Sequence, residues 1–462
     1  MTQVRAPERV VAWPMLAFEE VAKPQSDRGK RVKQRDYLPE GRIRIIDQGQ
    51  AFIGGYTNDD EFAYTGELPV VLFGDHTRAV KLIEHPFAVG ADGIKIFRPA
   101  EGVEPKYLYY WMKSARLPDR GYGRHYQYLR QLSVPVPPPA WQDEIVAEIE
   151  KQFSRLDEAV ANLKRAKAKL KRYKAAVLKA AVEGRLVPTE AELARREGRS
   201  YETGTQLLQR ILETRRSQWR GRGKYKEPMA PATMETHTLS EAWTWTSVDQ
   251  LAAHVTDGDH QPPPQTETGV PFLVIGNVRD GEIDFTQTRF VGHEYYESLD
   301  ENRRPRKGDL LYTLVGSYGI PVAVKTDKPF CIQRHIAILR PHAISPMDYL
   351  TVAMASSLVF KQAATVATGT AQLTVPLAGL RAISVPLPPP TEQHRIVAEV
   401  DRRLSLVGEV ESQVDANVMR AEHLRSAILN RVFSGRLFRH VVGMPEARSL
   451  LPAKINNHTT TA

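Results

Sequence analysis

The chain lacks several features that would assign it to particular classes of protein. Its single cysteine, Cys331, excludes a disulfide framework and a cysteine-based zinc site. No apolar run approaches the ~18 residues needed to cross a bilayer, and the charged N-terminus lacks the apolar core of a signal peptide. We therefore expect a protein of the reducing cytoplasm that makes no contact with a membrane.

Motifs for chemistry are also missing. The phosphate-binding Gly-x-x-x-x-Gly-Lys-Ser/Thr pattern is absent, because Gly223-Lys224 is followed by Tyr225. None of the triple prolines has the flanking residues of the Asn- or Asp-Pro-Pro-aromatic tetrapeptide that a methyltransferase places at its target amine. No histidine pair has the helical spacing of a metal site. The sequence thus predicts a chain with no catalytic residues, no metal ligands and no cofactor of its own.

The chain has fewer acidic than basic residues, and this charge balance indicates what kind of molecule it binds. The 462 residues include 63 Lys and Arg against 54 Asp and Glu, a formal net charge of +9. A positive surplus favours an acidic polymer as partner, and nucleic acid is the leading candidate. The length has room for about three domains, so we expect more than one core.

Proline is absent from 142–186 and from 393–437, and only three glycines interrupt these stretches. Both stretches predict long helices that end near a glycine suited to a left-handed cap. Apolar residues recur there in alternating steps of four and three, the period of a coiled coil. The predicted seam contains Ile149, Phe153, Leu156, Leu163 and Leu170 in the first helix and Val400, Leu404, Val407, Val414 and Val418 in the second. Polar residues break it at Lys167, Lys174, Glu411 and Arg425.

A duplication connects these two stretches. Residues 133–186 return 251 residues later as 384–437, without a gap and with 18 of 54 positions identical. Such a long, regular repeat indicates two similar halves. Each half begins with a globular block and ends with one long helix. Between them lies a short proline-rich segment, here called the proline-rich stop, that includes 137–139 in the first half and 388–390 in the second. We predict that the two helices pair as an antiparallel coiled coil, and that the repeat has pseudo-twofold symmetry.

The globular blocks mix short apolar runs with turn residues, which predicts an α+β chain containing two α/β domains. The first block should contain strands at 43–46, 69–73 and 93–97 and a helix at 105–113, and the second should contain one longer helix over 346–363. The predicted boundaries are 1–132 for the first block, 133–186 for its stop and helix, 187–237 for a charged linker, 238–383 for the second block, 384–437 for its stop and helix, and 438–462 for a disordered tail.

Clusters of cations, glycine, aromatics and small polar residues in the blocks are candidates for contact with DNA. Such side chains suit phosphates and base edges, although any single cluster is equally well explained as a solvated turn. The candidates in the first block are His76, Thr77, Arg78, Lys81, Arg120, Tyr122, Arg124 and Tyr126. Those in the second block are His260, Ser317, Tyr318, Arg334, Thr370 and Gln372.

Two alternative functions remain open at this point. Asp92, Glu104 and Lys106 can be arranged into a loose nuclease pattern. A self-contained nuclease or DNA-modification enzyme centred on these residues predicts metal-dependent cutting by the purified chain alone. A purely structural coiled-coil scaffold is the other alternative, but it leaves the two globular blocks without a purpose. We rank both below a DNA reader.

The arrangement resembles the specificity subunit of a type I restriction-modification system over nearly the whole chain. The residues that carry the resemblance are the Leu-Pro-Pro-Pro-Thr-Glu-Gln-His-Arg-Ile-Val segment at 387–397, its first copy near 136–146, and Phe-Gly-Asp-His-Thr at 73–77. The first copy departs from the family pattern, since Trp141 precedes Gln142 where Glu is usual.

The resemblance implies two target-recognition domains and a noncatalytic role. The chain would read a split, gapped sequence in double-stranded DNA and hold two copies of a methylation subunit, with ATP-dependent restriction subunits joining the complex. S-adenosylmethionine, ATP and Mg²⁺ would then belong to the partner subunits rather than to this chain.

Overall fold

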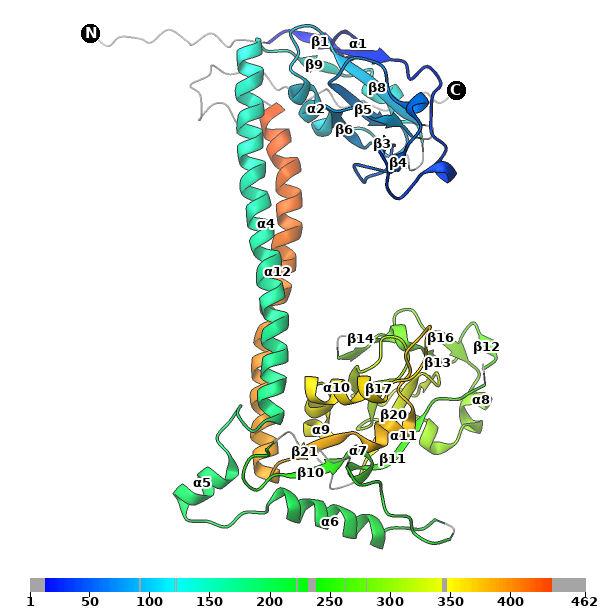
Figure 1. The fold of residues 1–462 in the computed structure, drawn as a ribbon, viewed down its shortest axis with the longest axis vertical. Helices are drawn as coiled ribbons and strands as arrows, with labels where there is room; N and C mark the ends of the chain where they lie inside the picture. Colours follow the sequence, from blue (N-terminus) through cyan, green and yellow to red (C-terminus); the bar gives the residue numbers. More distant parts are fainter. Residues whose placement is uncertain are drawn as a thin grey trace, which may run out of the picture. The chain divides into compact units, whose positions relative to one another are not determined.

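The structure, a computed structural model, describes residues 13–90, 93–119, 121, 123–221, 223–231, 238–261, 263–279, 281–342 and 347–433 (Figure 1). The chain divides into two compact units. Unit 1 contains 1–165 and 414–462, and unit 2 contains 166–413. Each unit therefore holds one globular block and one part of each long helix.

The first block is built on a four-stranded antiparallel sheet of order β2-β8-β5-β6 and a three-stranded sheet of order β4-β3-β7. Its strands are β1 (Met15–Ala17), β2 (Ala22–Gln25), β3 (Ile43–Ile46), β4 (Gly55–Thr57), β5 (Val70–Gly74), β6 (Val80–Ile83), β7 (Ala88–Val89), β8 (Ile94–Pro99) and β9 (Ser133–Pro135). Its helices are α1 (Phe18–Val21), α2 (Pro105–Ser114) and α3 (Tyr126–Leu129). The strands predicted at 43–46, 69–73 and 93–97 and the helix predicted at 105–113 are confirmed as β3, β5, β8 and α2.

The second block repeats this plan, with a four-stranded antiparallel sheet of order β11-β20-β17-β18 and a second sheet of order β12-β16-β13-β19. Its strands are β10 (Thr244–Ser247), β11 (Ala252–Asp257), β12 (Gln265–Thr266), β13 (Val270–Leu273), β14 (Val278–Arg279), β15 (Glu282–Ile283), β16 (Arg289–Val291), β17 (Leu310–Thr313), β18 (Pro321–Ala323), β19 (Cys331–Ile332), β20 (Ile336–Pro341) and β21 (Ser384–Leu387). Its helices are α7 (Val248–Leu251), α8 (His293–Ser298), α9 (Met347–Met354), α10 (Ser357–Val366) and α11 (Leu377–Ala382).

Each block closes by pairing its first strand with its last. Strand β1 is antiparallel to β9, and β10 is antiparallel to β21. The buried hydroxyl of Tyr107 donates to the Pro135 carbonyl at 2.7 Å, and that of Tyr349 donates to the Pro386 carbonyl at 2.8 Å. Since Pro135 and Pro386 are equivalent in the repeat, the same tyrosine contact closes both blocks.

The long helices α4 (Pro139–Val182) and α12 (Pro390–Phe433) confirm the two helices expected from the lack of proline. Gly184 follows α4 with φ +67, as expected for a left-handed cap. Gly435, the equivalent residue after α12, lies outside the described residues.

Contacts within each unit place these two helices side by side. In unit 2 the Lys174 ammonium lies 2.6 Å from the Glu411 carboxylate. In unit 1 Arg425 forms an ion pair with Asp157 and lies over the Phe153 ring, 5.3 Å from its centroid. Three of the predicted polar breaks in the seam therefore form ion pairs.

A buried glutamine fixes the start of each long helix. The Gln142 amide nitrogen donates to the Pro137 carbonyl at 2.8 Å, and that of Gln393 donates to the Pro388 carbonyl at 2.6 Å. Gln142 also donates to the Gly102 carbonyl and accepts from the Glu104 amide, at 2.9 and 2.8 Å. Because buried amides need partners, this glutamine joins helix α4 to the first block.

The structure corrects two expectations, that the charged, weakly helical segment 187–237 is only a linker and that one helix spans 346–363. The segment predicted as a linker contains α5 (Glu190–Glu197) and α6 (Gly204–Ser217), and the buried Leu207 and Ile211 of α6 belong to the core of unit 2. The longer helix predicted over 346–363 is two helices, α9 and α10, because the buried Ser356 hydroxyl caps the N-terminus of α10 by accepting from the Val359 amide.

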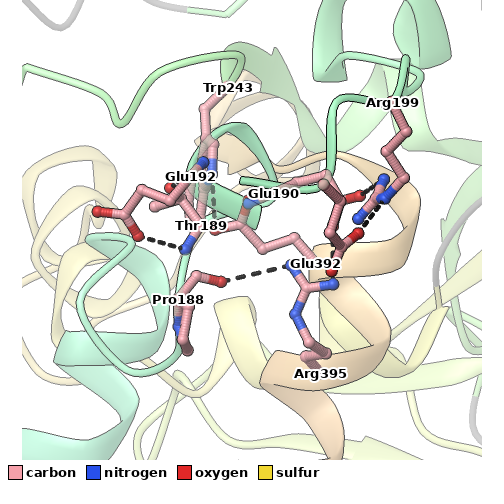
Figure 2. A network of polar contacts seen from close by, with 9 residues as sticks. Pro188, Thr189, Glu190, Glu192, Arg199, Trp243, Glu392 and Arg395 are labelled. Atoms are coloured by element: carbon pink, nitrogen blue, oxygen red, sulfur yellow. Dashed lines mark hydrogen bonds and ion pairs between the residues drawn. The ribbon is translucent and has the colours of Figure 1, made fainter. Parts of the chain in front are cut away.

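A polar network in unit 2 connects α5, α12 and the start of the second block (Figure 2). The Glu392 carboxylate accepts from the Trp243 indole at 3.1 Å and from the Glu190 amide at 2.9 Å. Glu190 itself is fully buried, and its carboxylate pairs with Arg395 at 2.7 Å and with Arg199. The network holds two acids and two arginines in a small volume, so it balances charge locally.

The pKa values of the two carboxyls in this network are shifted in opposite directions. Burial raises the pKa of Glu392. Burial also acts to raise the pKa of Glu190, but hydrogen bonds from Arg199, Arg395 and Thr391 outweigh it and hold that pKa below its usual range. A carboxyl with a lowered folded-state pKa stabilises the fold above its unfolded-state pKa, and the contribution disappears as the pH falls through the folded-state value.

Glu190→Gln is expected to lower the free energy of unfolding at pH 7 by about 3 kcal/mol, because it leaves two arginines without their shared carboxylate. The difference from wild type should shrink as the pH falls below that carboxyl's unfolded-state value near 4.5. Denaturant unfolding at several pH values measures both effects. Glu192→Gln, which changes an exposed acid of the same helix, serves as the control; an equal loss there would contradict the prediction.

Candidate nucleic-acid interface

In the first block, two of the predicted DNA-contacting loops meet at Asp75. This residue is 5% exposed and lies in the turn between β5 and β6. Its carbonyl accepts from the His125 amide, and its carboxylate accepts from the Tyr126 amide, both at 2.8 Å. The turn at 74–78 is thereby hydrogen-bonded to the start of α3. Arg120 and Tyr122, predicted for the same surface, lie outside the described residues.

Arg78 and Arg124 are the exposed cations of this surface. Arg78 has a φ of 60 and its guanidinium lies 3.4 Å from the Asp119 carboxylate. The Gly121 amide and then Arg78 hold the pKa of Asp119 below its usual range, so the carboxylate remains ionised. Because both side chains are exposed, a DNA phosphate can compete with Asp119 for Arg78.

Gln48 is hydrogen-bonded to the turn at 74–78. Its side-chain oxygen accepts from the His76 amide at 3.3 Å, and its carbonyl accepts from the Thr77 hydroxyl. The Thr77 hydroxyl also accepts from the Ala79 amide at 3.3 Å. Thr77 therefore shapes the turn, and the partly exposed His76 is left at its tip.

The structure corrects the role predicted for Lys81. Its side chain is 5% exposed, and its ammonium donates to the carbonyls of Asp47, at 2.8 Å, and Ala51. The Asp47 carboxylate lies 3.7 Å away. Burial lowers the pKa of Lys81, and Asp47 opposes this effect. Lys81 is thus a structural residue that holds the loop at 47–51, because its charge points into the block rather than to a ligand.

Tyr126 also packs inside its block to a large extent. Its ring lies 5.6 Å from that of Phe97, and its hydroxyl donates to Glu19 at 3.4 Å. The Lys95 ammonium lies 5.5 Å from the ring centroid. Only part of the ring is exposed, so its main role is to support the surface on which Arg124 lies.

In the second block, three loop segments meet at Leu314. The Leu314 amide donates to the His335 carbonyl at 2.8 Å, and its carbonyl accepts from the Val375 amide at 2.9 Å. The Gly316 amide donates to the Leu373 carbonyl at 3.0 Å. The loops that carry Ser317, Tyr318, Arg334, Thr370 and Gln372 therefore share one hydrogen-bonded frame.

Within this frame Ser317, Arg334, Thr370 and Gln372 are exposed. Tyr318 is half-buried and stacks on Phe360, with 5.6 Å between ring centroids and 8° between planes. His260 belongs to a different loop, where its Nε2 lies 2.9 Å from the Asp257 carboxylate. Arg303 lies 3.9 Å from Asp257. The exposed polar side chains suit contacts with nucleobases or phosphates. The stacking of Tyr318 on Phe360 limits the movement of the loop at 316–319.

The predicted seam residues differ in burial. Ile149, Val400, Val407 and Val414 are buried, at 0, 1, 5 and 6% exposure. Phe153, Leu156, Leu163, Leu170, Leu404 and Val418 are half-buried. A pair of helices covers only one face of each, so a half-buried seam is expected where no third element packs.

The residues of the nuclease alternative have structural roles. Glu104 caps helix α2 by accepting from the Tyr107 amide, and Lys106 pairs with Glu150 of α4 at 2.7 Å. Asp92 lies outside the described residues. Among the residues that the structure describes, no group of His, Cys, Asp or Glu could hold a metal ion. No helix in the described ranges is long and apolar enough to span a membrane.

Several residues that shape these loops were missing from the predicted set: Gln48, Asp75, Asp119, His125 and Arg303. Asp75 and His125 lie inside the predicted clusters, where a small acid and a histidine between glycines and cations could have indicated a hydrogen-bonded loop pair. Gln48 and Arg303 lie far from the clusters in sequence, and no local pattern marks them.

Comparison with known proteins finds sequence similarity to specificity subunits of type I restriction enzymes. It is 26% identical over 314 residues to the specificity subunit of the type I restriction enzyme EcoBI of Escherichia coli, covering 67% of this chain and 59% of that one. It is 30% identical over 156 residues to the EcoR124I/EcoR124II specificity subunit of Escherichia coli, covering 30% of this chain and 38% of that one. The chain thus spans less than two thirds of either relative. These relatives confirm the resemblance to type I specificity subunits.

A solved structure of a type I R-M system, concerned with complex assembly and conformational transition, contains a similar chain. The TM-score is 0.57 at 16% sequence identity, and the match covers 93% of this chain and 100% of that one. This likeness supports the mixed α+β fold. No family model matches the sequence.

Lys81→Met is expected to lower the free energy of unfolding by about 2 to 4 kcal/mol, because two buried carbonyls lose their donor. Arg334→Ala, at an exposed cation of the other block, should change it by no more than about 0.5 kcal/mol. Chemical denaturation measures both values. If Lys81→Met left stability unchanged but abolished binding to DNA, Lys81 would be a ligand contact and the structural role would be refuted.

Proposed function

We propose that this chain is the noncatalytic DNA-recognition subunit of a type I restriction-modification complex. It reads a split target in double-stranded DNA, one part with each globular block, and leaves the bases between them unread. The observation that carries the proposal is the repeated joint. The four-stranded antiparallel sheets of the two blocks share one strand order, and each block leads into a long helix whose buried glutamine bonds to a proline carbonyl.

Direct reading of bases requires exposed donors and acceptors on a rigid support. In the first block, Arg78 and Arg124 suit guanine edges or phosphates. In the second block, Arg334 and Gln372 offer a cation and an amide from one frame, and an amide pairs well with adenine. Two blocks with different loops favour two different half-sites.

The helices are proposed to act as a spacer. We infer that α4 and α12 pair along their length as an antiparallel coiled coil, because Lys174–Glu411 and Asp157–Arg425 are consistent with a single alignment. A pseudo-twofold repeat would then present both blocks to one face of the duplex when the half-sites lie about one helical turn apart, roughly 34 Å.

Partner subunits are proposed to supply the chemistry. The pseudo-twofold repeat provides two equivalent docking surfaces, which fits two copies of a methylation subunit. Exposed apolar side chains on α12, Leu406, Val410 and Leu424, favour protein contacts along this helix. ATP-dependent restriction subunits would complete the assembly in the cytoplasm, and S-adenosylmethionine, ATP and Mg²⁺ would be bound by the partners.

Deletion of the gene should abolish methylation at one split, gapped motif of the genome, since the complex loses its only reader. Methylation profiling of cells with and without the gene measures this and identifies the target. A strain with Arg196→Ala, an exposed change in α5, serves as the control and should retain the pattern. An unchanged methylation pattern after deletion would contradict the proposal.

Removing one heptad from each helix, residues 163–169 and 414–420, should shorten the unread gap without changing the bases read. Seven residues of helix span about 10 Å, which corresponds to about three base pairs at 3.4 Å each. Profiling the motif methylated by the shortened variant measures the gap. A control variant replaces each heptad with a copy of its neighbour, which preserves length. Recognition of the original gap by the shortened protein would disprove the spacer role.

A further inference from the structure

The basic segment of residues 215–221 and 223–229 contributes to neither recognition surface, yet it borders a distinct pocket in unit 2. The pocket has a volume of about 1120 Å³ and lies between this segment and residues of the second block. Its charged lining is predominantly basic, comprising Arg215, Arg220, Lys224, Lys226 and Arg381 against Glu227 and Asp249. A cavity with such a lining attracts anions.

Both acids of the lining are already engaged. Glu227 pairs with Arg216 at 2.5 Å, and the Asp249 carboxylate accepts from the Met229 amide at 2.8 Å. Lys224 and Lys226 are exposed, so their ammonium groups can move toward a ligand. The acids therefore do little to neutralise the lysines.

Two of the cations are held in position by backbone contacts. Arg215 donates to the carbonyls of Asp249 and Ala252, the latter at 2.8 Å. Arg381 donates to the Val255 carbonyl. A guanidinium has five donor hydrogens, so each arginine retains donors beyond these bonds. Fixed arginines lose less side-chain entropy on binding than free ones.

Two buried polar atoms lining the pocket have no hydrogen-bond partner among the described residues. They are the Tyr225 hydroxyl and Nδ1 of His342, a residue that is 7% exposed. Buried polar groups usually have a partner, so these two atoms are available to hydrogen-bond a ligand or water. Burial and then Arg215 lower the pKa of His342. The exposed Trp219 packs edge-on against Tyr225, with 5.7 Å between ring centroids.

We propose that this pocket binds the phosphate backbone of duplex DNA independently of sequence. The inference rests on the proposed function, which brings duplex DNA to this chain. Lys224, Lys226 and Arg220 would neutralise phosphates, while Tyr225 would donate its free hydroxyl to a phosphate oxygen. Contacts of this kind add affinity without sequence information and make it dependent on salt.

The test uses the full chain copurified with its methylation subunits and a fluorescent duplex that lacks the methylated motif. Affinity is measured by anisotropy over a range of salt concentrations. For Lys224→Ala/Lys226→Ala, the slope of log affinity against log salt should become shallower by about 1.8, since each phosphate contact contributes about 0.9. Arg195→Ala/Arg196→Ala removes the same charge from the exposed face of α5 and should leave the slope unchanged.

Tyr225→Phe provides a second test that does not depend on charge. The hydroxyl has no partner in the described structure, so its loss should not lower the unfolding midpoint. Affinity for the same duplex should fall roughly fivefold, the effect of one hydrogen bond. Single-stranded DNA of equal length is measured in parallel.

The outcomes separate the two proposals. If the wild-type complex binds no duplex, the proposed function and this inference both fail. If it binds but the two pocket variants match the wild type, only the pocket assignment is overturned. The pocket assignment is also overturned if Arg195→Ala/Arg196→Ala lowers duplex affinity as much as the pocket variants do. It is likewise overturned if the pocket variants lose affinity only for single-stranded DNA, or only recover less of the methylation subunits. Genomic methylation at the same motif by the pocket variants would show that specific reading is intact and support the inference.

Discussion

The buried amide of Gln142 is the constraint on which the arrangement of the first half depends. It bonds simultaneously to the proline-rich stop, to Gly102 and to the residue that caps helix α2. Because all three bonds restrict the Gln142 side chain, they fix the first turn of α4 against the first block. In the second half Gln393 makes the same bond to its own proline run, while Glu392 adds the links to Trp243 and α5. The position of the first block relative to helix α4 is therefore set by the bonds of Gln142.

Much of this architecture could be predicted, because it is encoded in periodic or repeated residues. The lack of proline predicted α4 and α12 nearly to their ends, and the apolar period predicted that Ile149 and Val400 are buried. The polar breaks Lys174 and Glu411 were expected to affect alignment, but their pairing with each other depends on the register of the helices. Register is a tertiary property, so no window of sequence contains it.

The loops were less predictable, because exposure is decided by segments far away in the chain. Lys81 follows a turn rich in polar groups, as a DNA contact would, yet the loop at 47–51 covers it and supplies carbonyl acceptors. The segment at 187–237 has the charge of a linker, but Leu207 and Ile211 are spaced four apart on one helix face and pack into a core. Its charge obscured a short apolar pattern that was present in the sequence.

The composition of the first core has a consequence for the order of synthesis. Leu429, Val432 and Phe433, at the end of α12, pack with residues of the first block, and the Phe433 ring lies 5.5 Å from that of Tyr107. The ribosome therefore releases the first block about three hundred residues before its last apolar partners, at roughly 5–20 residues per second. During that interval Tyr107 and the seam of α4 remain uncovered. The nascent first block therefore exposes apolar surface until the end of α12 has been made.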